Sequence, residues 1–443
     1  MSLQRRLCGL FVLLALIAGA GAGTQRDAAA ALPSGNAVQQ WDEIAVTTVT
    51  RSGAFQNEGL TYMAYVSAAV YDAITSIEGT YEPFVEKIDA PAGASSQAAA
   101  VEAAYRTLIY YFPAPRATGS PDLDALYAEA LQAIPDGPAK WAGIRAGATA
   151  AVQVIYSRRH DGRRMPIASS SPFAPKPAAG IWRRTPSAFL APQTPWVGKE
   201  KPFVLERANQ FLPAAPPKLS SSTWANELNE IKALGRATGS SRTPEQTDIA
   251  RFWSTNVIVQ YNQAVRDTAA GRGLGLLETA RLMAMVNIVA SDAQIACLNA
   301  KYHFAFWRPV TAIDPSSVSA TDGGPAPGFD DGNPATAEEP GWRPLLTTPN
   351  HPEYPAAHGS LTSAMAEVFT YFSNTPKIDL TLTSTIVPTM RTRHFGTADD
   401  LRNEIVLARL WGGLHYRSSS VAGVTLGRRV ARYDLTNAFQ PVK

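Results

Sequence analysis

Three short segments in the last third of the chain carry residue types that could together hold a tetrahedral oxyanion. They cover residues 301–309, 354–360 and 409–415. Guanidinium groups are permanently charged, and their forked donors match the oxygens of phosphate-like anions. The sequence therefore predicts one site for a multiply charged anion between residues 295 and 420. The residues expected to surround it, called the oxyanion cage below, are Lys301, Arg308, His358, Arg409 and His415.

The spacing of the first cage residues predicts how they converge. Lys301 and Arg308 are seven residues apart, so on one continuing helix their side chains would project within about 20° of each other. Pro309 disfavours helical geometry at the residue before it, so we expect the element to end there. His358 stands beside an expected helix start, where free backbone N–H groups and the helix dipole favour an anion.

Arg409 and His415 need a break in the chain between them if they are to share a target. They are six residues apart, which is about 240° around a regular helix. Gly412 and Gly413 lie between them, and a glycine pair can end a helix. We therefore expect the chain to turn after Arg409 and to bring His415 back towards it.

The composition excludes several classes of protein. The chain has 443 residues, of which 45% are hydrophobic, so it can build a large core. Its net charge of +3 is small and its cations are scattered, so no nucleic-acid partner or anionic membrane surface is indicated. Cys297 is the only cysteine beyond the first thirty residues. We therefore expect no internal disulfide, and we interpret Cys297 as a buried core residue.

Residues 1–30 read as a targeting segment and not as part of the fold. Arg5 and Arg6 precede an apolar run over residues 7–17, and small residues follow it. This order is typical of a secretory signal peptide, and the run is too short to span a bilayer comfortably. We expect a secreted or periplasmic protein without a membrane partner once the signal is removed. A retained membrane anchor is the alternative interpretation.

Apolar residues follow a three-four spacing in most of the remaining chain, which predicts an all-α fold. Examples are the rows over residues 60–77 and 101–112, and we expect a long helix from about residue 276 to Lys301. Alternating strand patterns are nearly absent. Residues 160–220 and 313–355 are rich in proline, glycine and small polar residues, which indicates long ordered surface loops. The pattern fits two packed helical bundles within residues 31–443.

The three segments resemble the motifs of a known superfamily. K-x6-R-P, P-x-x-H and R-x5-H are similar to the phosphatidic-acid-phosphatase type 2 and vanadium-dependent haloperoxidase superfamily. The surrounding residues resemble its bacterial haloperoxidase branch, through Trp-Arg-Pro-Val-Thr-Ala-Ile at 307–313, His-Pro-Glu-Tyr-Pro at 351–355 and Gly-Gly-Leu-His-Tyr-Arg at 412–417. The resemblance extends to Ala-Ala-Val-Tyr-Asp at 68–72, so it covers nearly all of the chain after the leader. It implies an all-α fold of two four-helix bundles.

The resemblance also implies a role for each cage residue. His415 would bind vanadium directly through a ring nitrogen, and His358 would handle protons at the apical oxygen. The backbone N–H of Ala357 would be a further donor to vanadate, or to phosphate in the same site. The implied reaction is the oxidation of a halide by hydrogen peroxide to hypohalous acid, with an unidentified organic acceptor. The equatorial oxygens of vanadate would be held by Lys301, Arg308 and Arg409.

Two positions depart from the family pattern. The family has Pro-Ser-Gly-His where this chain has Pro-Ala-Ala-His at 355–358. Losing the serine hydroxyl would weaken anion binding by roughly 1–3 kcal/mol if its partner stays unpaired, and Ser360 and Thr362 are the candidate replacements. The related phosphatases carry an aspartate four residues after the last histidine, where this chain has Ser419. This difference favours a haloperoxidase over a phosphatase.

His351, seven residues before His358, is the position expected to tune halide choice. In the family a phenylalanine there accompanies chloride oxidation and a histidine accompanies bromide oxidation, so we expect bromide to be favoured. The alternative is that His351 only caps the loop before Pro352. Two other functions stay open: an acid phosphatase that uses the same cage, and an exported helical binding protein without catalysis. Whether the chain forms a homo-oligomer is also left open.

Overall fold

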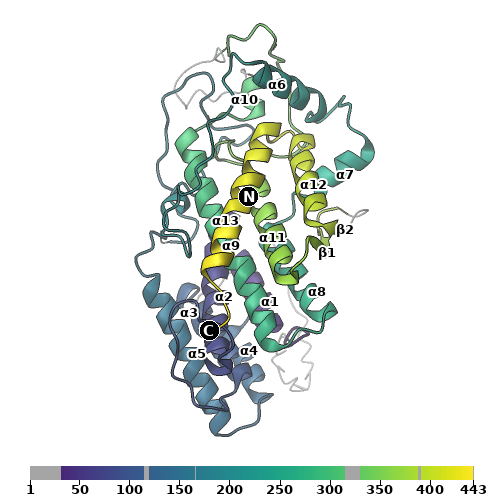
Figure 1. The fold of residues 1–443 in the computed structure, drawn as a ribbon. Helices are drawn as coiled ribbons and strands as arrows, with labels where there is room; N and C mark the ends of the chain where they lie inside the picture. Colours follow the sequence, from purple (N-terminus) through teal and green to yellow (C-terminus); the bar gives the residue numbers. More distant parts are fainter. Residues whose placement is uncertain (1–30, 114–118, 165, 315–329, 388–390, 443) are drawn as a thin grey trace, which may run out of the picture.

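The computed structural model describes residues 31–113, 119–164, 166–314, 330–387 and 391–442. Within these residues the chain is mainly α-helical, which confirms the fold class expected from the apolar spacing. The expected signal peptide falls in residues 1–30, outside the described residues, so it stays a prediction. Figure 1 shows the N-terminal helices at one end of an elongated molecule and the C-terminal helices at the other.

The N-terminal bundle contains the first five helices. Helix α2 is buried along most of its length and is ended by Gly79, whose backbone is left-handed with a φ of 71°. Helices α3 and α5 touch backbone to backbone, because a Cβ added at Gly147 would lie 2.3 Å from the carbonyl oxygen of Ala99. The helices are α1 (Ala37–Arg51), α2 (Gln56–Glu78), α3 (Ser96–Tyr111), α4 (Leu123–Gln132) and α5 (Pro138–Ser157).

The C-terminal bundle is built around α9, α11, α12 and α13. Helices α11 and α13 lie so close that a Cβ at Gly427 would be 1.9 Å from the carbonyl oxygen of Ser360. This contact fixes the start of α11, where His358 lies. The helices of this half are α6 (Ser222–Leu234), α7 (Pro244–Phe252), α8 (Val257–Gly271), α9 (Leu276–Phe304), α10 (Pro309–Ile313), α11 (Ala357–Ser373), α12 (Ala398–Trp411) and α13 (Arg417–Asn437).

Helix α9 belongs to both bundles, since it packs against α2 as well as α11 and α13. Its bounds agree with the long helix expected from about residue 276 to Lys301. Among the described residues it is the one helix long and apolar enough to cross a membrane, and 94% of its apolar window is buried inside the protein. That burial is typical of a core helix. Cys297 lies on this helix and is fully buried, as expected.

A small antiparallel sheet is an element that the sequence interpretation missed. Strands β1 (Lys377–Thr383) and β2 (Thr392–Thr397) pair with Leu380 opposite Phe395. The signal was present, because Ile378, Leu380 and Leu382 alternate with polar residues and are buried. A run of seven residues was too short to stand out among the helical patterns.

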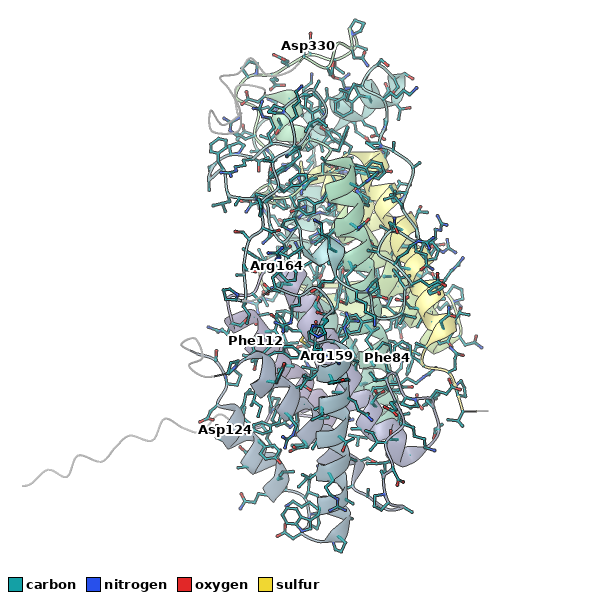
Figure 2. All side chains as sticks on the ribbon, turned by 90° about the vertical axis from the view of Figure 1, so that its left-hand side faces the viewer. Phe84, Phe112, Asp124, Arg159, Arg164 and Asp330 are labelled. Atoms are coloured by element: carbon teal, nitrogen blue, oxygen red, sulfur yellow. The ribbon has the colours of Figure 1, made fainter. Side chains whose placement is uncertain are left out.

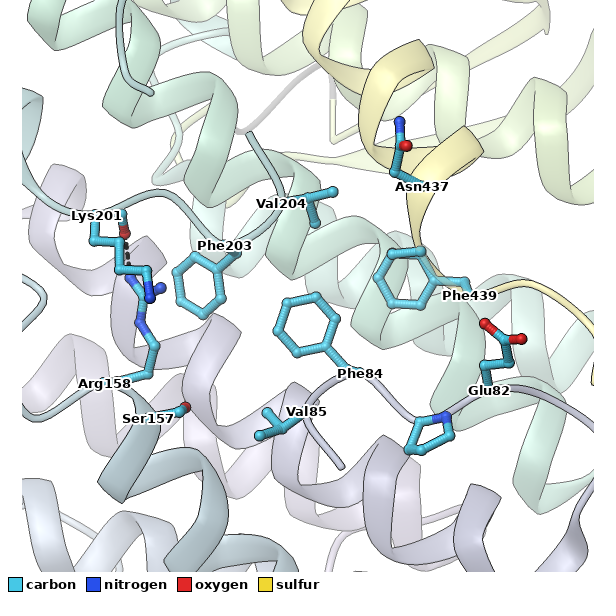
Figure 3. A pocket seen from close by; sticks show the side chains of 12 residues that line it. Glu82, Phe84, Val85, Ser157, Arg158, Lys201, Phe203, Val204, Asn437 and Phe439 are labelled. Carbon is cyan, nitrogen blue, oxygen red and sulfur yellow. Dashed lines mark hydrogen bonds between the residues drawn. The ribbon is translucent and has the colours of Figure 1, made fainter. Parts of the chain in front are cut away.

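The two bundles meet along an aromatic cluster that lines an open pocket of about 360 Å³. Phe84 stacks on Phe439 with ring centroids 6.0 Å apart, and the guanidinium of Arg158 lies 4.0 Å from the ring centroid of Phe203 (Figure 3). Arg158 also donates hydrogen bonds to the carbonyl oxygens of Lys201 and Pro202, so it holds this junction in place. Figure 2 shows Phe84 midway along the molecule, where the two bundles meet.

The two proline-rich stretches are ordered loops where the structure describes them, and both reach the cage region. Residues 180–182 pair with residues 305–307, since Trp182 N–H donates to Ala305 O at 2.6 Å and Trp307 N–H to Gly180 O at 3.0 Å. The second loop enters α11 through residues 349–356. The short 3-10 helix η1 (Val197–Lys199) packs on α9 from the first loop.

Candidate functional site

A pocket of about 400 Å³ opens where the start of α11 meets the end of α12. It brings together residues from five parts of the chain, including the start of α2. Three residues of the predicted cage line it, and two more, Lys301 and Arg308, lie behind its wall. The lining residues are Gln56, Asn57, Gln193, Ser254, Leu346, Thr347, Pro349, His351, Ala357, His358, Leu361, Arg409, Leu414 and His415.

Lys301 is fully buried in the last turn of α9. Its Nζ donates hydrogen bonds to the carbonyl oxygens of Pro352 at 3.0 Å and Glu353 at 2.8 Å. These bonds leave one of the three ammonium donors for another acceptor. Burial lowers the pKa of Lys301 to about 7, with a smaller contribution from Arg308 in the same direction. A bound anion would offset this desolvation and favour the charged lysine.

Arg308 reaches the site from a loop and not from a continuing helix. Helix α9 ends at Phe304, and Ala305 has a left-handed backbone. The seven-residue helical projection considered for Lys301 and Arg308 therefore does not apply, although the two side chains still converge on one region. The helix was expected to end at Arg308, before Pro309, but it ends four residues earlier, and Arg308 is the N-cap of α10, which begins at Pro309.

The guanidinium of Arg308 joins the second and third segments. Nε donates to the carbonyl oxygen of His351 at 2.9 Å, and Nη1 donates to that of Leu414 at 3.0 Å. The same Nη1 lies 3.3 Å from Nε2 of His415, and Nη2 lies 3.0 Å from Nδ1 of His351. Burial lowers the pKa of Arg308 to about 10, which leaves it charged at neutral pH.

Arg409 is the cation with the most donors left for a ligand. Its Nη1 donates to the carbonyl oxygen of Trp253 at 3.1 Å. Its buried Nε has no hydrogen-bond partner among the described residues. Burial, then repulsion from Arg308, lowers the pKa of Arg409 to about 9. A buried guanidinium with unused donors beside a pocket suits an anionic ligand.

The glycine pair turns the chain after α12 as predicted. Gly413 has a φ of 74°, and a Cβ there would lie 2.4 Å from the carbonyl oxygen of Gly235. The turn is closed by a hydrogen bond from Leu414 N–H to the carbonyl oxygen of Arg409 at 3.2 Å. His415 is thereby brought back to the pocket, where Arg409 also lies.

His415 forms a buried pair with Glu353, a residue to which the sequence interpretation gave no role. His415 Nδ1 lies 2.8 Å from Glu353 Oε1, which also accepts the backbone N–H of Tyr416 at 3.0 Å. Both side chains are almost fully buried. Burial raises the pKa of Glu353 to about 7, although Lys301 and Arg308 oppose the shift. Glu353 stands in the quoted motif at 351–355, but its partner lies 62 residues away, so no local pattern indicated the contact.

His358 lies in the first turn of α11 and is half-buried in the pocket wall. Burial lowers its pKa well below 6.5, and Arg409, Lys301 and Arg308 lower it further. A neutral imidazole at this position can accept a proton. The start of α11 has no side-chain cap at Ala356, so its first backbone N–H groups, including that of Ala357, are available to an anion.

Neither candidate replacement for the family serine takes that role. Ser360 Oγ donates to the carbonyl oxygen of Ala293 at 3.3 Å, in the contact between α11 and α9. Thr362 Oγ1 lies 2.6 Å from the hydroxyl of Tyr261. Both residues are fully buried in helix packing, so the hydroxyl that Ala356 lacks has no substitute from them.

His351 is buried, and its ring contacts a cage cation. Its Nδ1 lies 3.0 Å from Arg308 Nη2 and 3.1 Å from the carbonyl oxygen of Pro352. A guanidinium can only donate and a carbonyl oxygen can only accept, so the two contacts favour opposite tautomers. We assign Nδ1 as the acceptor and the proton to Nε2, because the bond from the charged guanidinium is the stronger of the two. Burial lowers the pKa of His351 well below 6.5, and Lys301 and Arg308 add to this. The expected alternative, a role only in the loop before Pro352, does not account for the bond to Arg308.

The charges around the pocket fit vanadate or another tetrahedral oxyanion. Three buried cations face one buried carboxylate, and the pKa of each of the three histidines is lowered, so the rings are neutral near pH 7. This leaves an excess of positive charge, the unpartnered Nε of Arg409 and the uncapped start of α11. His415 Nε2 would be the ring nitrogen available as a ligand, since Nδ1 is occupied by Glu353. Residues that could hold the group are Lys301, Arg308, Ala357, His358, Arg409 and His415.

Known proteins resemble this chain in sequence and in fold. A family model described as the second helical-bundle domain of vanadium chloroperoxidase (VCPO) matches residues 281–443. Vanadium chloroperoxidase from Curvularia inaequalis is 24% identical over an alignment of 327 residues, and the match covers 58% of this chain. The match covers 49% of that relative, so this chain spans about half of its length.

Two solved structures share the fold of nearly the whole chain. A bacterial vanadium-dependent iodoperoxidase superposes with a TM-score of 0.71 and 20% identity, and the alignment covers 92% of this chain and 96% of the other. The holo form of a bacterial vanadium-dependent chloroperoxidase gives a TM-score of 0.68 at 17% identity, and the alignment covers 91% of this chain and 97% of the other. These matches confirm the resemblance seen in the motifs: the chain has the fold of the vanadium haloperoxidases, and its residues 281–443 match the second helical-bundle domain of vanadium chloroperoxidase.

Proposed function

We propose that this chain is an exported vanadate-dependent haloperoxidase that oxidises halide with hydrogen peroxide to hypohalous acid. The observation that supports this most directly is the arrangement around His415. Its Nδ1 is occupied by Glu353, and its Nε2 faces Arg308 beside a pocket with excess positive charge. If one side chain is the only direct protein ligand of vanadium, it must offer a lone pair, and a neutral imidazole nitrogen does so.

Each cage residue then has a task that its surroundings support. Arg409 and the backbone N–H groups at the start of α11 would bind the anion from the pocket. Lys301 and Arg308, which are buried next to the pocket, would add positive charge. Bound vanadate would supply a Lewis-acidic centre at which hydrogen peroxide becomes a stronger oxidant of halide. His358 lies in the pocket as a neutral imidazole, so it can take a proton from incoming peroxide and return one to water or hydroxide.

Bromide is the proposed halide, with chloride oxidised less readily. The support is His351, whose Nε2–H donor belongs to a pocket-lining ring that is fixed by Arg308. A hydrogen-bond donor at this position alters how strongly the bound oxidant is polarised. A phenylalanine ring at the same position has no such donor. Iodide belongs in the same assay, because one structural relative is described as an iodoperoxidase.

A phosphatase is the second candidate, and the Glu353–His415 pair favours it more than the sequence did. A carboxylate does support the last histidine, although from position 353 and not from position 419. Nε2 of His415 would bond to phosphorus while the bond to the ester oxygen breaks, and that oxygen would take a proton from His358. Water would then cleave the nitrogen–phosphorus bond. The lowered pKa of His358 opposes this reaction near neutral pH, because the ring lacks the proton to donate.

One experiment separates these functions. The mature chain is purified, freed of bound anions and assayed with hydrogen peroxide and iodide, bromide or chloride, with and without orthovanadate. Hydrolysis of p-nitrophenyl phosphate is measured in parallel between pH 4 and 8. We expect vanadate-dependent halogenation that exceeds hydrolysis. Hydrolysis without halogenation would establish the phosphatase. The absence of both activities would favour a binding protein. Sequencing the N-terminus of the exported protein tests the proposed signal peptide and the secreted or periplasmic location.

A further inference from the structure

We propose that Glu353 is a positioning residue that makes His415 a ligand, by holding its ring in the tautomer whose Nε2 lone pair faces the oxyanion. The inference rests on the proposed function, because it concerns the residue expected to bind vanadium. It assigns a task to a side chain that lies outside the cage predicted from the motifs.

The position of the Glu353 carboxylate oxygen is set by two donors. Oε1 lies 2.8 Å from His415 Nδ1 and accepts the backbone N–H of Tyr416 at 3.0 Å. The backbone N–H is fixed by the turn into α13, so the oxygen is held at one place beside the ring. An oxygen already held by a backbone donor selects the Nδ1–H form of His415.

The contact at Nε2 of His415 favours the same Nδ1–H tautomer. His415 Nε2 lies 3.3 Å from Arg308 Nη1, and a guanidinium has no lone pair to offer. Nε2 must therefore carry the lone pair, while Nδ1 carries the proton. Two independent neighbours thus agree on a ring whose free electron pair lies on the side of the cage.

The backbone of Glu353 ties this histidine to the cations. The carbonyl oxygens of residues 351, 352 and 353 accept hydrogen bonds from Arg308 or Lys301. One short segment therefore fixes both cations through its backbone and fixes His415 through its side chain. This arrangement keeps the ring nitrogen and the charged donors at a constant separation.

The positioning role of Glu353 predicts a change in vanadate affinity that differs from the change expected from charge alone. Removing a carboxylate near three cations should strengthen the binding of any oxyanion by charge alone. Phosphate needs only those cations, whereas vanadate also needs a bond from Nε2. Loss of an outer hydrogen bond to a metal-binding histidine lowers metal affinity by about 10- to 100-fold. Vanadate and phosphate should therefore respond in opposite directions.

Three variants of the full mature chain test this proposal. Glu353→Met removes the acceptor at similar length, and Glu353→Gln keeps an oxygen for Nδ1–H but removes the charge. The matched control is Glu227→Gln, since Glu227 is another buried carboxylate that holds the start of α13, through Ser418 N–H at 2.8 Å. Equilibrium dialysis gives the Kd for orthovanadate, calorimetry gives the Kd for inorganic phosphate, and thermal unfolding reports the fold.

We expect Glu353→Met to bind vanadate about 10- to 100-fold more weakly while phosphate binds as well as before or better. Glu353→Gln should lie between Glu353→Met and wild type, and Glu227→Gln should match wild type for both anions. Equal vanadate affinity in Glu353→Met and wild type overturns the proposal, as does a parallel loss of both anions with a lowered Tm. Wild type that fails to bind vanadate would instead refute the proposed function, so the two failures are distinct.

Discussion

Arg308 Nη2 lies 3.0 Å from Nδ1 of His351, and this contact decides which face of the histidine meets the pocket. Because the arginine can only donate, the imidazole presents its remaining N–H, on Nε2, away from the arginine. His351 lines the pocket together with His358 and His415. A position that could have been a simple loop residue is thus a hydrogen-bond donor held by a cage cation.

Replacing His351 with phenylalanine should shift halide preference towards chloride. The change removes the Nε2–H donor and frees one N–H of Arg308 for the oxyanion. We expect the ratio of kcat/KM for chloride to that for bromide to rise by about tenfold, which corresponds to about 1.4 kcal/mol between the two barriers. The measurement compares both halides at one pH, with His303→Phe as control because His303 is exposed on α9. A wild type that oxidises chloride as readily as bromide would contradict the proposed role.

Arg409→Ala should weaken phosphate and vanadate together. Its guanidinium has unused donors beside the pocket, and hydrogen bonds to charged groups contribute about 1.5–3 kcal/mol each. We therefore expect about a 100-fold rise in both dissociation constants, with a partial rise for Arg409→Lys because lysine retains the charge without the fork. Calorimetric titration of each anion is the measurement. The exposed Arg145→Ala, on α5, is the control, and unchanged affinities in Arg409→Ala would remove Arg409 from the anion site.

The cage cations could be recognised in the sequence because their determinants are local. Pro309 and the Gly412–Gly413 pair each mark a chain break within a few residues of a cation, and the structure has a break at both places. The contact between Glu353 and His415 could not be predicted in this way. It depends on how α13 packs against α11, and its two residues are far apart in the sequence.

Most helices of the fold were also predictable from local sequence patterns, whereas the β1–β2 hairpin was not. Long apolar rows with a three-four spacing specify helices such as α2 and α9 largely by themselves. The β1–β2 hairpin is stabilised by packing Leu380 and Phe395 into the core beside α8 and α12. Short strands depend on such tertiary contacts, so their sequence signal is weak.

Ala356→Ser should strengthen anion binding and stabilise α11. Position 356 is the N-cap of this helix, with extended backbone and no side-chain cap. A serine oxygen there can accept a helix N–H while its hydroxyl hydrogen donates to the anion. We expect both vanadate and phosphate to bind up to about tenfold more tightly, and the free energy of unfolding to rise by about 1 kcal/mol. Anion titrations with thermal unfolding provide the measurement, and unchanged affinity would show that this hydroxyl does not reach the anion.

Asp434 offers a prediction about stability that does not involve the pocket. It is fully buried on α13, and neither carboxylate oxygen has a partner among the described residues. Burial, and then the nearby Asp292, raises its pKa well above 3.8. The folded protein therefore holds a proton that the unfolded chain releases above about pH 4. Its contribution makes the fold less stable as the pH rises from about 4 towards the raised pKa.

Asp434→Asn should remove the loss of stability that Asp434 causes as the pH rises, because the amide is neutral at every pH. The stability of the variant relative to wild type should increase with pH, by up to about 1.4 kcal/mol per pH unit. Thermal unfolding of both proteins at pH 5, 6, 7 and 8 measures the difference, in which the other titrating groups cancel. Asp89→Asn, at an exposed position, is the control and should give a constant difference. A constant difference for Asp434→Asn as well would mean that Asp434 is ionised in the fold, which its unpartnered oxygens on α13 make costly.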